Sequence, residues 1–200
     1  MPKPVTIDFY LDFMSPFGYL ARAALLRIAT KYGADIAYHP VNLVRLKRAA
    51  GNTGPSNREI PPKIAYLTED LQRWAKRYGI QMARELAGPD SSRLNKGFFF
   101  ARDKNQATDY VRHAWDCVWR DGLDPGLTTT VSEAARRMQW NVDDFLAFVE
   151  SETAQQQYEA ENIAAIQRGV FGIPTFVIGD QMWWGNDRLD FLEEYLAATV

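Results

Sequence analysis

Hydrophobic residues near the N-terminus form first a continuous apolar run and then a helical pattern. Residues 4–10, "PVTIDFY", are typical of a buried strand. Apolar residues then recur at helical spacing between Ser15 and Gly33, which predicts a helix that ends at the glycine. Residues 34–41, "ADIAYHPV", predict a second strand, and this strand–helix–strand order is typical of a parallel pair. The apolar positions of the predicted helix are Leu20, Ala24, Leu25 and Ile28.

The middle of the chain has a different character. Residues 47–62 are rich in Gly, Asn and Pro, and this composition predicts a loop. Helical patterns then fill most of the stretch up to residue 169 and predict a large helical insertion. The predicted helices span residues 63–79, 105–122, 132–140, 142–151 and 154–169.

The next strand signal lies in residues 172–196, "GIPTFVIGDQMWWGNDRLDFLEEYL". "TFVIG" and "MWW" predict the two strands of a hairpin, and "DQ" predicts its turn. A last helix is expected to begin at Asn186 as its N-cap, with Asp187 placed where the helix dipole favours a negative charge. The inner positions of that helix are Leu189, Leu192 and Leu196.

These elements together predict an α/β protein with a thioredoxin-like fold, in the order β-α-β, a helical insert, then β-β-α. Residues 1–46 and 170–200 are expected to form the thioredoxin-like domain, which is discontinuous in sequence. Residues 47–169 are expected to form the loop and the inserted helical domain.

Composition excludes several classes of function. The net charge is -2, from 23 basic and 25 acidic residues, which gives no general attraction to nucleic acid or to anionic membranes. The N-terminus lacks the apolar core of a signal peptide and no apolar run spans a bilayer, so a cytoplasmic protein is expected. His39 and His113 sit in no ligand-spaced cluster, so no metal site is predicted. Cys117 is the single cysteine, which rules out an intrachain disulfide, and we expect it to be a core residue.

Ser15 has two interpretations. Ser followed by Pro16 is a preferred start of a helix, because Ser caps the first turn and Pro suits its first position. In a thioredoxin-like fold the same place is the reactive corner, where redox proteins carry Cys-x-x-Cys. The matching residues here, 15–18, contain no cysteine, so this corner cannot exchange disulfides. It can still bind a thiolate from another molecule, with the Ser15 hydroxyl as donor.

Two C-terminal motifs also have two interpretations each. "GIPT" at 172–175 is either a plain turn or a cis-proline that lets Ile173 offer its backbone to an extended thiol peptide. The run "WWGNDR" at 183–188 is either a hairpin followed by a helix cap or a site for a peptide terminus. In the second case, N–H groups and the Asn186 side chain hold a carboxylate, and Asp187 pairs with an α-amine.

The chain resembles the 2-hydroxychromene-2-carboxylate isomerases of bacterial naphthalene catabolism over essentially its whole length. These proteins belong with the kappa-class glutathione transferases and, more distantly, with the DsbA-like oxidoreductases. "SPFGYL" and "WWGNDRL" are the motifs specific to the isomerase and kappa branch. The resemblance also rests on "DFMSPFGYL", "GNTGPSNRE", "DLQRWAKRYGI" and "FGIPTFVIGDQMWWGNDRL".

The resemblance implies glutathione as the cofactor. It implies that Ser15 lies against the glutathione sulfur, and that Ile173, before Pro174, pairs its backbone with the cysteinyl part. The residues implied around the γ-glutamyl end are Trp184, Gly185, Asn186 and Asp187, with Arg188 assisting.

The resemblance also implies a substrate side that anchors an aromatic carboxylate. Its cations would be Lys47 and Arg48 from the loop after the second strand, and Arg58 beside Asn57 in "PSNRE". Without the resemblance, Lys47 and Arg58 are equally well read as solvated loop charges. Residues 90–100, "DSSRLNKGFFF", are expected to add a wall to this pocket.

The implied activity interconverts 2-hydroxychromene-2-carboxylate and trans-o-hydroxybenzylidenepyruvate by reversible addition of the glutathione thiolate. That thiolate is a borrowed nucleophile, which Ser15 stabilises without attacking the substrate itself. Two alternatives stay open: a kappa-like glutathione transferase that releases conjugates, and a redox-inactive DsbA-like scaffold that only binds peptides. By the same resemblance, a homodimer is expected.

Overall fold

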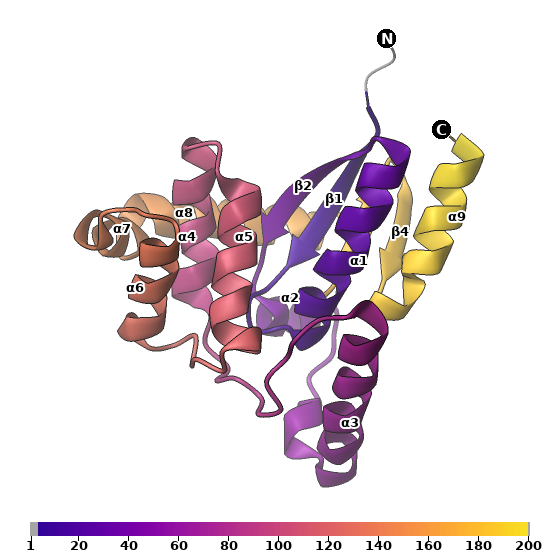
Figure 1. Ribbon diagram of the computed structural model, residues 1–200, viewed down its shortest axis with the longest axis horizontal. Coiled ribbons are helices and arrows are strands. Elements are labelled where there is room, and N and C mark those ends of the chain that lie inside the picture. Colours follow the sequence, from indigo (N-terminus) through magenta and orange to yellow (C-terminus); the bar gives the residue numbers. More distant parts are fainter. Residues whose placement is uncertain (1–3, 200) are drawn as a thin grey trace.

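The protein is built around a four-stranded mixed sheet with helices on both faces, and the computed structural model describes residues 4–199 (Figure 1). The strand order is β2-β1-β3-β4, in which β1 and β2 are parallel and β3 is antiparallel to both of its neighbours. The strands are β1 (Thr6–Leu11), β2 (Asp35–Pro40), β3 (Thr175–Ile178) and β4 (Gln181–Trp184).

The helices follow the predicted order β-α-β, helical insert, β-β-α, which is confirmed. α1 connects the two parallel strands and α9 closes the chain against it, while α2 to α8 lie between β2 and β3 (Figure 1). The helices are α1 (Pro16–Tyr32), α2 (Leu43–Ala49), α3 (Pro61–Tyr78), α4 (Ser92–Asp103), α5 (Ala107–Trp115), α6 (Thr128–Arg137), α7 (Val142–Val149), α8 (Glu152–Gln167) and α9 (Leu189–Thr199). Two 3₁₀ turns, Asn57–Glu59 and Asn186–Arg188, and a π-helical turn, Asp116–Arg120, complete the set.

Each face of the sheet covers its own core. Alternate residues of β1 belong to the larger core, where Phe9 stacks on Phe176 with ring centroids 5.0 Å apart. The predicted inner positions of α1 and α9 are buried in this core, as their spacing requires. Tyr10 points to the opposite face and belongs to a smaller core with residues of α2, α8 and β3. The members of this smaller core are Tyr10, Val41, Leu46, Ala165, Val170, Ile173 and Val177.

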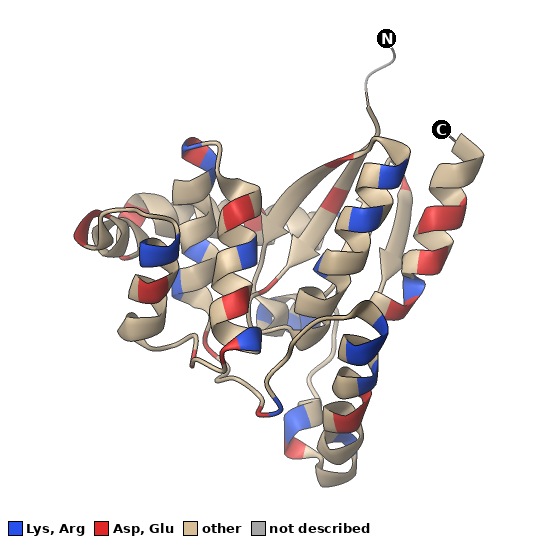
Figure 2. Cartoon of the chain, in the orientation of Figure 1, with Lys and Arg blue, Asp and Glu red and all other residues tan. Residues whose placement is uncertain are grey.

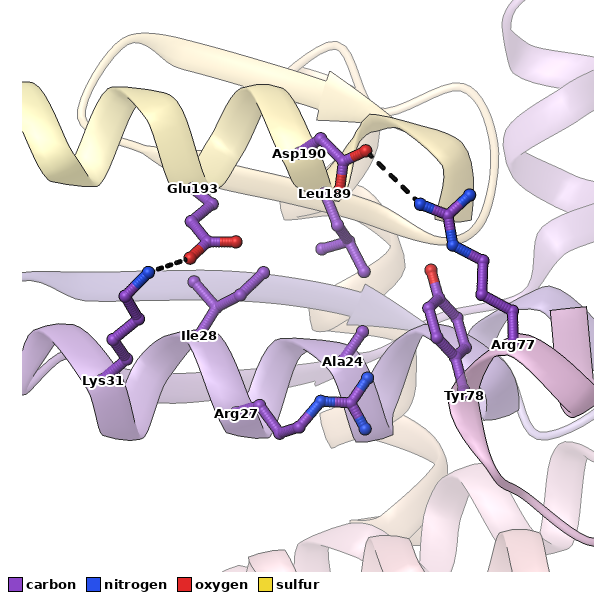
Figure 3. A pocket seen from close by; sticks show the side chains of 9 residues that line it. All are labelled: Ala24, Arg27, Ile28, Lys31, Arg77, Tyr78, Leu189, Asp190 and Glu193. Carbon is purple, nitrogen blue, oxygen red and sulfur yellow. Dashed lines mark hydrogen bonds and ion pairs between the residues drawn. The ribbon is translucent and has the colours of Figure 1, made fainter.

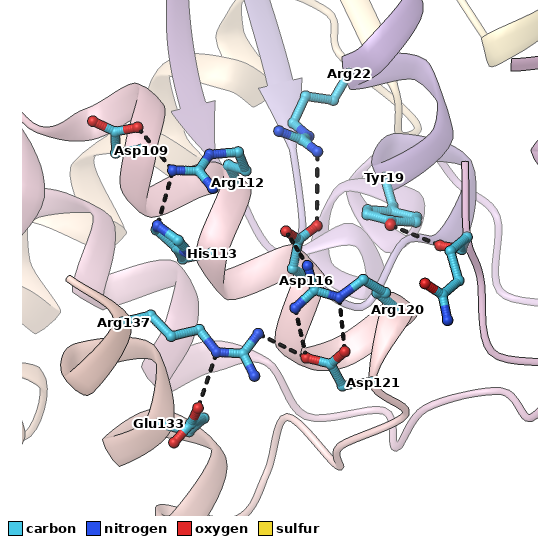
Figure 4. A network of polar contacts seen from close by, with 11 residues as sticks. Tyr19, Arg22, Asp109, Arg112, His113, Asp116, Arg120, Asp121, Glu133 and Arg137 are labelled. Carbon is cyan, nitrogen blue, oxygen red and sulfur yellow. Dashed lines mark hydrogen bonds and ion pairs between the residues drawn. The ribbon is translucent and has the colours of Figure 1, made fainter. Parts of the chain in front are cut away.

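The helical insert is fastened to the first turns of α1. The Trp119 indole N–H donates to the carbonyl of Phe13 at 2.9 Å. Trp115 packs so closely on Gly18 that an added Cβ there would lie 2.9 Å from the indole Cζ2. Figure 4 shows the polar layer beside these contacts, in which Asp116 pairs with Arg22 of α1 at 3.8 Å. The thioredoxin-like part and the insert therefore share one packed seam at the start of α1.

Two helices occupy segments that the sequence pattern placed otherwise. α2 includes Lys47 and Arg48, so the prediction that these residues lie in a loop is wrong. The Asn42 side chain caps α2 by accepting from the Arg45 N–H at 2.9 Å, and Leu46 anchors it in the smaller core. Most of residues 90–100 lies in α4, a largely buried helix that the sequence pattern did not predict, and their role as a wall of the substrate pocket stays a prediction.

The start of the last helix also differs from expectation. The hairpin of β3 and β4 is confirmed, but the N-cap prediction for Asn186 is wrong. Gly185 holds the cap position with φ 111°, a conformation that favours glycine, and Asn186 opens the 3₁₀ turn that precedes α9. Asp187 does lie in the first turn, as expected.

Ion pairs on the surface connect elements that are distant in the chain. Figure 2 shows Lys and Arg on α1 opposite Asp and Glu on α9, and Lys31 pairs with Glu193 at 2.6 Å. Within residues 4–199, no helix has both the length and the apolarity to cross a membrane. The same part of the chain contains no group of His, Cys, Asp and Glu side chains arranged to hold a metal ion. Cys117 is fully buried, which confirms its predicted place in the core, and burial raises its pKa to about 11.

The stability of the protein should depend on pH through His39. Its Nδ1 lies 2.6 Å from Glu161 and its Nε2 lies 3.0 Å from Asp8. Burial lowers the pKa of His39, but the two carboxylates outweigh burial and the net pKa is raised above 6.5. A raised folded pKa stabilises the protein fully below the unfolded value, and this stabilisation is lost as pH rises through the folded pKa. Urea unfolding should therefore give a free energy that falls as pH rises above 6.5.

The control for this prediction is the second histidine. His39→Gln should abolish the fall, because no imidazolium is left between the two carboxylates. His113→Gln should preserve it, because burial lowers the pKa of His113 and its contribution has the opposite sign. Equal pH slopes in the wild type and His39→Gln would contradict the assignment.

Candidate functional site

The sheet register brings the predicted site segments to one edge of the sheet. Tyr10 lies opposite Thr175, and the N–H of Gly185 donates to the carbonyl of Pro174 at 2.9 Å. Leu11 is paired with Pro40 on the other side. The chain therefore leaves β1 toward Ser15, enters β3 through Pro174, and leaves β2 and β4 at the same edge. The helix starts and turns at this edge are the segments in which the sequence predicted the thiol site.

Ser15 is the N-cap of α1. Its hydroxyl oxygen accepts from the N–H of Gly18 at 3.2 Å, and Pro16 holds the first helical position. The cap interpretation is therefore confirmed. The thiolate interpretation needs the hydroxyl proton, and no acceptor for that proton lies within residues 4–199. Ser15 is only 3% exposed, so a ligand atom that reaches it lies at the very start of the helix.

The proline segment has the geometry expected of it. The Ile173–Pro174 peptide bond is cis. The side chain of Ile173 is buried in the smaller core, while its N–H and C=O make no hydrogen bond to the rest of the described chain. An unpaired backbone N–H and C=O at the head of a strand can pair with an extended ligand as an added strand does.

The run from Trp184 to Arg188 is only partly accessible. Trp184 is half exposed, and its ring packs against Phe171 with centroids 5.0 Å apart. Asp187 and Arg188 form an exposed ion pair of 2.6 Å. Asn186 is different, because it is 3% exposed and neither side-chain amide atom has a partner in the described part of the chain. Asn186 therefore faces the protein interior rather than solvent.

The cations predicted on the substrate side come from two separate elements. Lys47 and Arg48 lie in the last turn of α2, where Lys47 is half-buried and Arg48 is exposed. Arg58 lies with Asn57 in the 3₁₀ turn that packs on α3, and its Nη1 donates to the carbonyl of Ala87 at 2.5 Å.

The environment of Arg58 is that of an unneutralised cation. Burial lowers the pKa of its guanidinium, and no carboxylate within residues 4–199 forms an ion pair with it. Lys47 likewise has no ion pair in this range. The neighbouring Arg45 shows the contrast, because Glu159 holds its guanidinium through two hydrogen bonds. Arg58 and Lys47 are thus free to receive an anion.

Sequence reasoning missed one buried polar group at this edge. Asp12 follows β1 directly, is 2% exposed, and accepts hydrogen bonds from the Leu43 N–H at 2.9 Å and the Asn95 amide at 3.0 Å. Burial raises the pKa of Asp12 above its usual value, because it outweighs the hydrogen bonds from Leu43, Ser91, Asn95 and Met14, which lower the pKa. The available signal was an acidic residue inside the aromatic run "FYLDFM", where an unpaired carboxylate is unexpected.

A surface groove lies elsewhere, between α1, the end of α3 and α9 (Figure 3). It is lined by none of the predicted site residues. Its charges largely neutralise one another, with Lys31 paired to Glu193 at 2.6 Å and Arg77 to Asp190 at 3.9 Å. We therefore regard this groove as a solvated seam between helices.

Comparison with known proteins agrees with the fold and with the family resemblance. Residues 6–197 match the family model of the DSBA-like thioredoxin domain. The chain is 44% identical over 187 residues to 2-hydroxychromene-2-carboxylate isomerase of Pseudomonas putida, which covers 94% of this chain and 92% of that protein. A solved structure of 2-hydroxychromene-2-carboxylate isomerase superposes with a TM-score of 0.92 at 42% identity, covering 97% and 95% of the two chains.

A more distant relative, glutathione S-transferase kappa 1 of Homo sapiens, is 23% identical over 213 residues, with 98% and 92% of the chains covered. The fold and these identities define the class of the protein as a DSBA-like thioredoxin protein with a helical insertion. Within that class, the chain belongs to the 2-hydroxychromene-2-carboxylate isomerase family, as its motifs predicted.

Proposed function

We propose that the protein is a glutathione-dependent isomerase that interconverts 2-hydroxychromene-2-carboxylate and trans-o-hydroxybenzylidenepyruvate in aromatic catabolism. The observation that carries the proposal is a reactive corner with Ser15 in place of a cysteine, in a chain 44% identical to a protein of that isomerase name. Disulfide chemistry has no support at this corner, because the single cysteine, Cys117, is buried with a raised pKa.

Three features of the corner fit glutathione. The start of α1 offers positive dipole potential, and the Ser15 hydroxyl has its proton available. The unpaired N–H and C=O of Ile173 suit the cysteinyl part of the tripeptide. For the γ-glutamyl end we propose Trp184, Gly185, Asn186, Asp187 and Arg188, of which Asp187 is exposed and negative and so suits the α-amine.

The chemistry follows from the need to change the geometry of a conjugated double bond. When bound, glutathione supplies a thiolate that adds reversibly to that bond, permits rotation and leaves again. The protein contributes the electrostatics: Ser15 donates a hydrogen bond to the sulfur, and the α1 dipole favours its negative charge. Ser15 does not attack the substrate.

The substrate carboxylate is proposed to bind the cations that have no carboxylate partner. Arg58 can form a bidentate pair, and its partial burial strengthens that pair by excluding water. Lys47 and Arg48 in α2 add positive charge at the same sheet edge, and Asn57 adds a neutral polar group beside Arg58. A homodimer and a cytoplasmic location stay predictions that rest on the family resemblance.

The proposed reaction regenerates glutathione, and this separates it from the alternatives. Incubation of the protein with 2-hydroxychromene-2-carboxylate and a tenth of an equivalent of glutathione should bring the whole pool of substrate to its equilibrium with the product. Absorbance follows the substrate, and a thiol assay follows glutathione. Loss of one glutathione per product would favour a transferase that releases conjugates. No glutathione binding by calorimetry at millimolar ligand would favour a peptide-binding scaffold.

Ser15→Ala separates the cap from the thiolate role. Loss of the cap should cost about 1 kcal/mol of unfolding free energy. Loss of a hydrogen bond to a charged group, worth roughly 1.5–3 kcal/mol, should raise the pKa of the bound thiol by about one to two units. Thiolate absorbance of the glutathione complex, measured against pH, reports this shift. Ser151→Ala is the matched control, because Ser151 caps α8 in the same way, far from residue 15 in the chain.

Lower stability of Ser15→Ala with an unchanged thiol titration and full turnover would leave Ser15 as a cap alone. Ser151→Ala should lower stability by at least as much and leave the thiol titration unaffected, since its hydroxyl caps the first turn of α8 and also donates to the Phe148 carbonyl at 2.6 Å.

Arg58→Ala tests the carboxylate site. It should raise KM for the substrate at least tenfold and leave the glutathione Kd within a factor of two, because Arg58 is assigned to the carboxylate alone. Arg58→Lys should recover only part of the loss, since an ammonium group cannot pair bidentately. Arg45→Ala is the control, because Glu159 already neutralises that guanidinium. Equal losses for both ligands would show that Arg58 serves glutathione or the fold instead.

A further inference from the structure

Asp12 lies at the sheet edge that carries both parts of the proposed thiol site. The Ser15 N–H donates to the Asp12 carbonyl at 2.8 Å, so the two residues share the turn that opens α1. On the other side, the register pairs Tyr10 with Thr175 at the end of the β1–β3 pairing. Asp12 and Ile173 each lie two residues beyond that last pair, so both flank the same edge of the sheet.

The carboxylate of Asp12 is held by donors alone. Its Oδ2 accepts from the Leu43 N–H at 2.9 Å, and its Oδ1 accepts from the Met14 N–H at 3.2 Å and the Asn95 amide at 3.0 Å. The Ser91 hydroxyl adds a further short hydrogen bond. Three of the four donors are N–H groups, which cannot accept, so these contacts favour the ionised carboxylate and oppose the burial that raises its pKa. No cationic side chain pairs with Asp12 anywhere in residues 4–199.

These donors belong to elements that are distant in the chain. Leu43 is the first residue of α2, the helix that carries Lys47. Ser91 holds the N-cap position of α4, yet its hydroxyl makes no cap and serves Asp12 instead. The buried Asp12 carboxylate therefore connects the turn before α1 to the starts of α2 and α4.

We propose that Asp12 is a positioning residue of this site, which fixes Ser15 relative to α2 and keeps a buried negative charge beside the bound thiol. This inference rests on the proposed function, because its ligand is the bound glutathione proposed there. The charge opposes thiolate formation and so balances the favourable dipole of α1. That balance suits reversible addition, because a thiol of very low pKa is a poor nucleophile and the best attacking thiol has a pKa near ambient pH.

Asp12→Asn tests the charge while keeping the side-chain shape. The pKa of bound glutathione should fall by about one unit, because a nearby negative charge is removed. At the same time KM for the aromatic carboxylate should rise at least fivefold, because one amide oxygen cannot hold all the donors that fix α2. Asp8→Asn is the matched control on the same strand, and its carboxylate contacts His39 instead. It should change neither value.

Ser91→Ala keeps the charge and removes one donor. The thiol pKa should stay within a few tenths of the wild-type value, while KM should rise about threefold. If Asp12 had only a structural role, Asp12→Asn would lower the unfolding free energy and change nothing else. An unchanged thiol titration and an unchanged KM in folded Asp12→Asn would therefore overturn the proposal. If Asp12→Asn does not fold, Ser91→Ala decides, and an unchanged KM would overturn it.

The proposed function and this inference fail in different ways. Wild-type protein that binds no glutathione contradicts the proposed function before any substitution is made. The positioning role is then judged without ligand, by amide hydrogen exchange. Exchange at Met14 and Leu43 should be faster in Ser91→Ala than in the wild type, because the acceptor they share is held less firmly. Unchanged exchange at both amides would overturn the positioning role.

Discussion

The arrangement of the reactive edge depends on one buried carboxylate. A charged group taken out of water is costly unless it is fully hydrogen-bonded, and Asp12 is 2% exposed with no cation to neutralise it. Its acceptor capacity is met only when Met14, Leu43 and the start of α4 are all in place. The turn that presents Ser15 and the helix that presents Lys47 are therefore fixed together, rather than as independent loops.

Local patterns were sufficient to predict the thioredoxin-like frame. The apolar run before Ser15, the helical spacing after it and Gly33 at φ 62° define β1 and α1 from neighbouring residues alone. The C-terminal hairpin could be predicted in the same way, because "TFVIG" and "MWW" flank a tight turn. Such elements need no distant partner to set their limits, so the sequence next to them carries the information.

The elements that escaped prediction depend on distant contacts. α2 is only seven residues long, too short for a clear period, and Leu46 is its one buried side chain. α4 is buried from Leu94 to Phe99, so it has no polar face to contrast with an apolar one. The contacts of Ser91 and Asn95 with Asp12 span 79 and 83 residues of chain. The place of Asn186 likewise depends on a distant contact, because its 3₁₀ turn packs on α1 and buries the side chain, so its preference for caps does not decide its position.

The replacement of cysteine by serine at the start of α1 changes what this corner can do without changing its frame. A cysteine there would be both the nucleophile and the group that the dipole stabilises. Ser15 keeps the cap to Gly18 and leaves a hydroxyl proton to donate, so the corner can stabilise a thiolate that it does not own. The unpaired backbone of Ile173 suits the peptide that is proposed to bring such a thiolate. In the proposed reaction that peptide is held by hydrogen bonds alone, so it would add to a substrate, leave and serve again, as an isomerase requires.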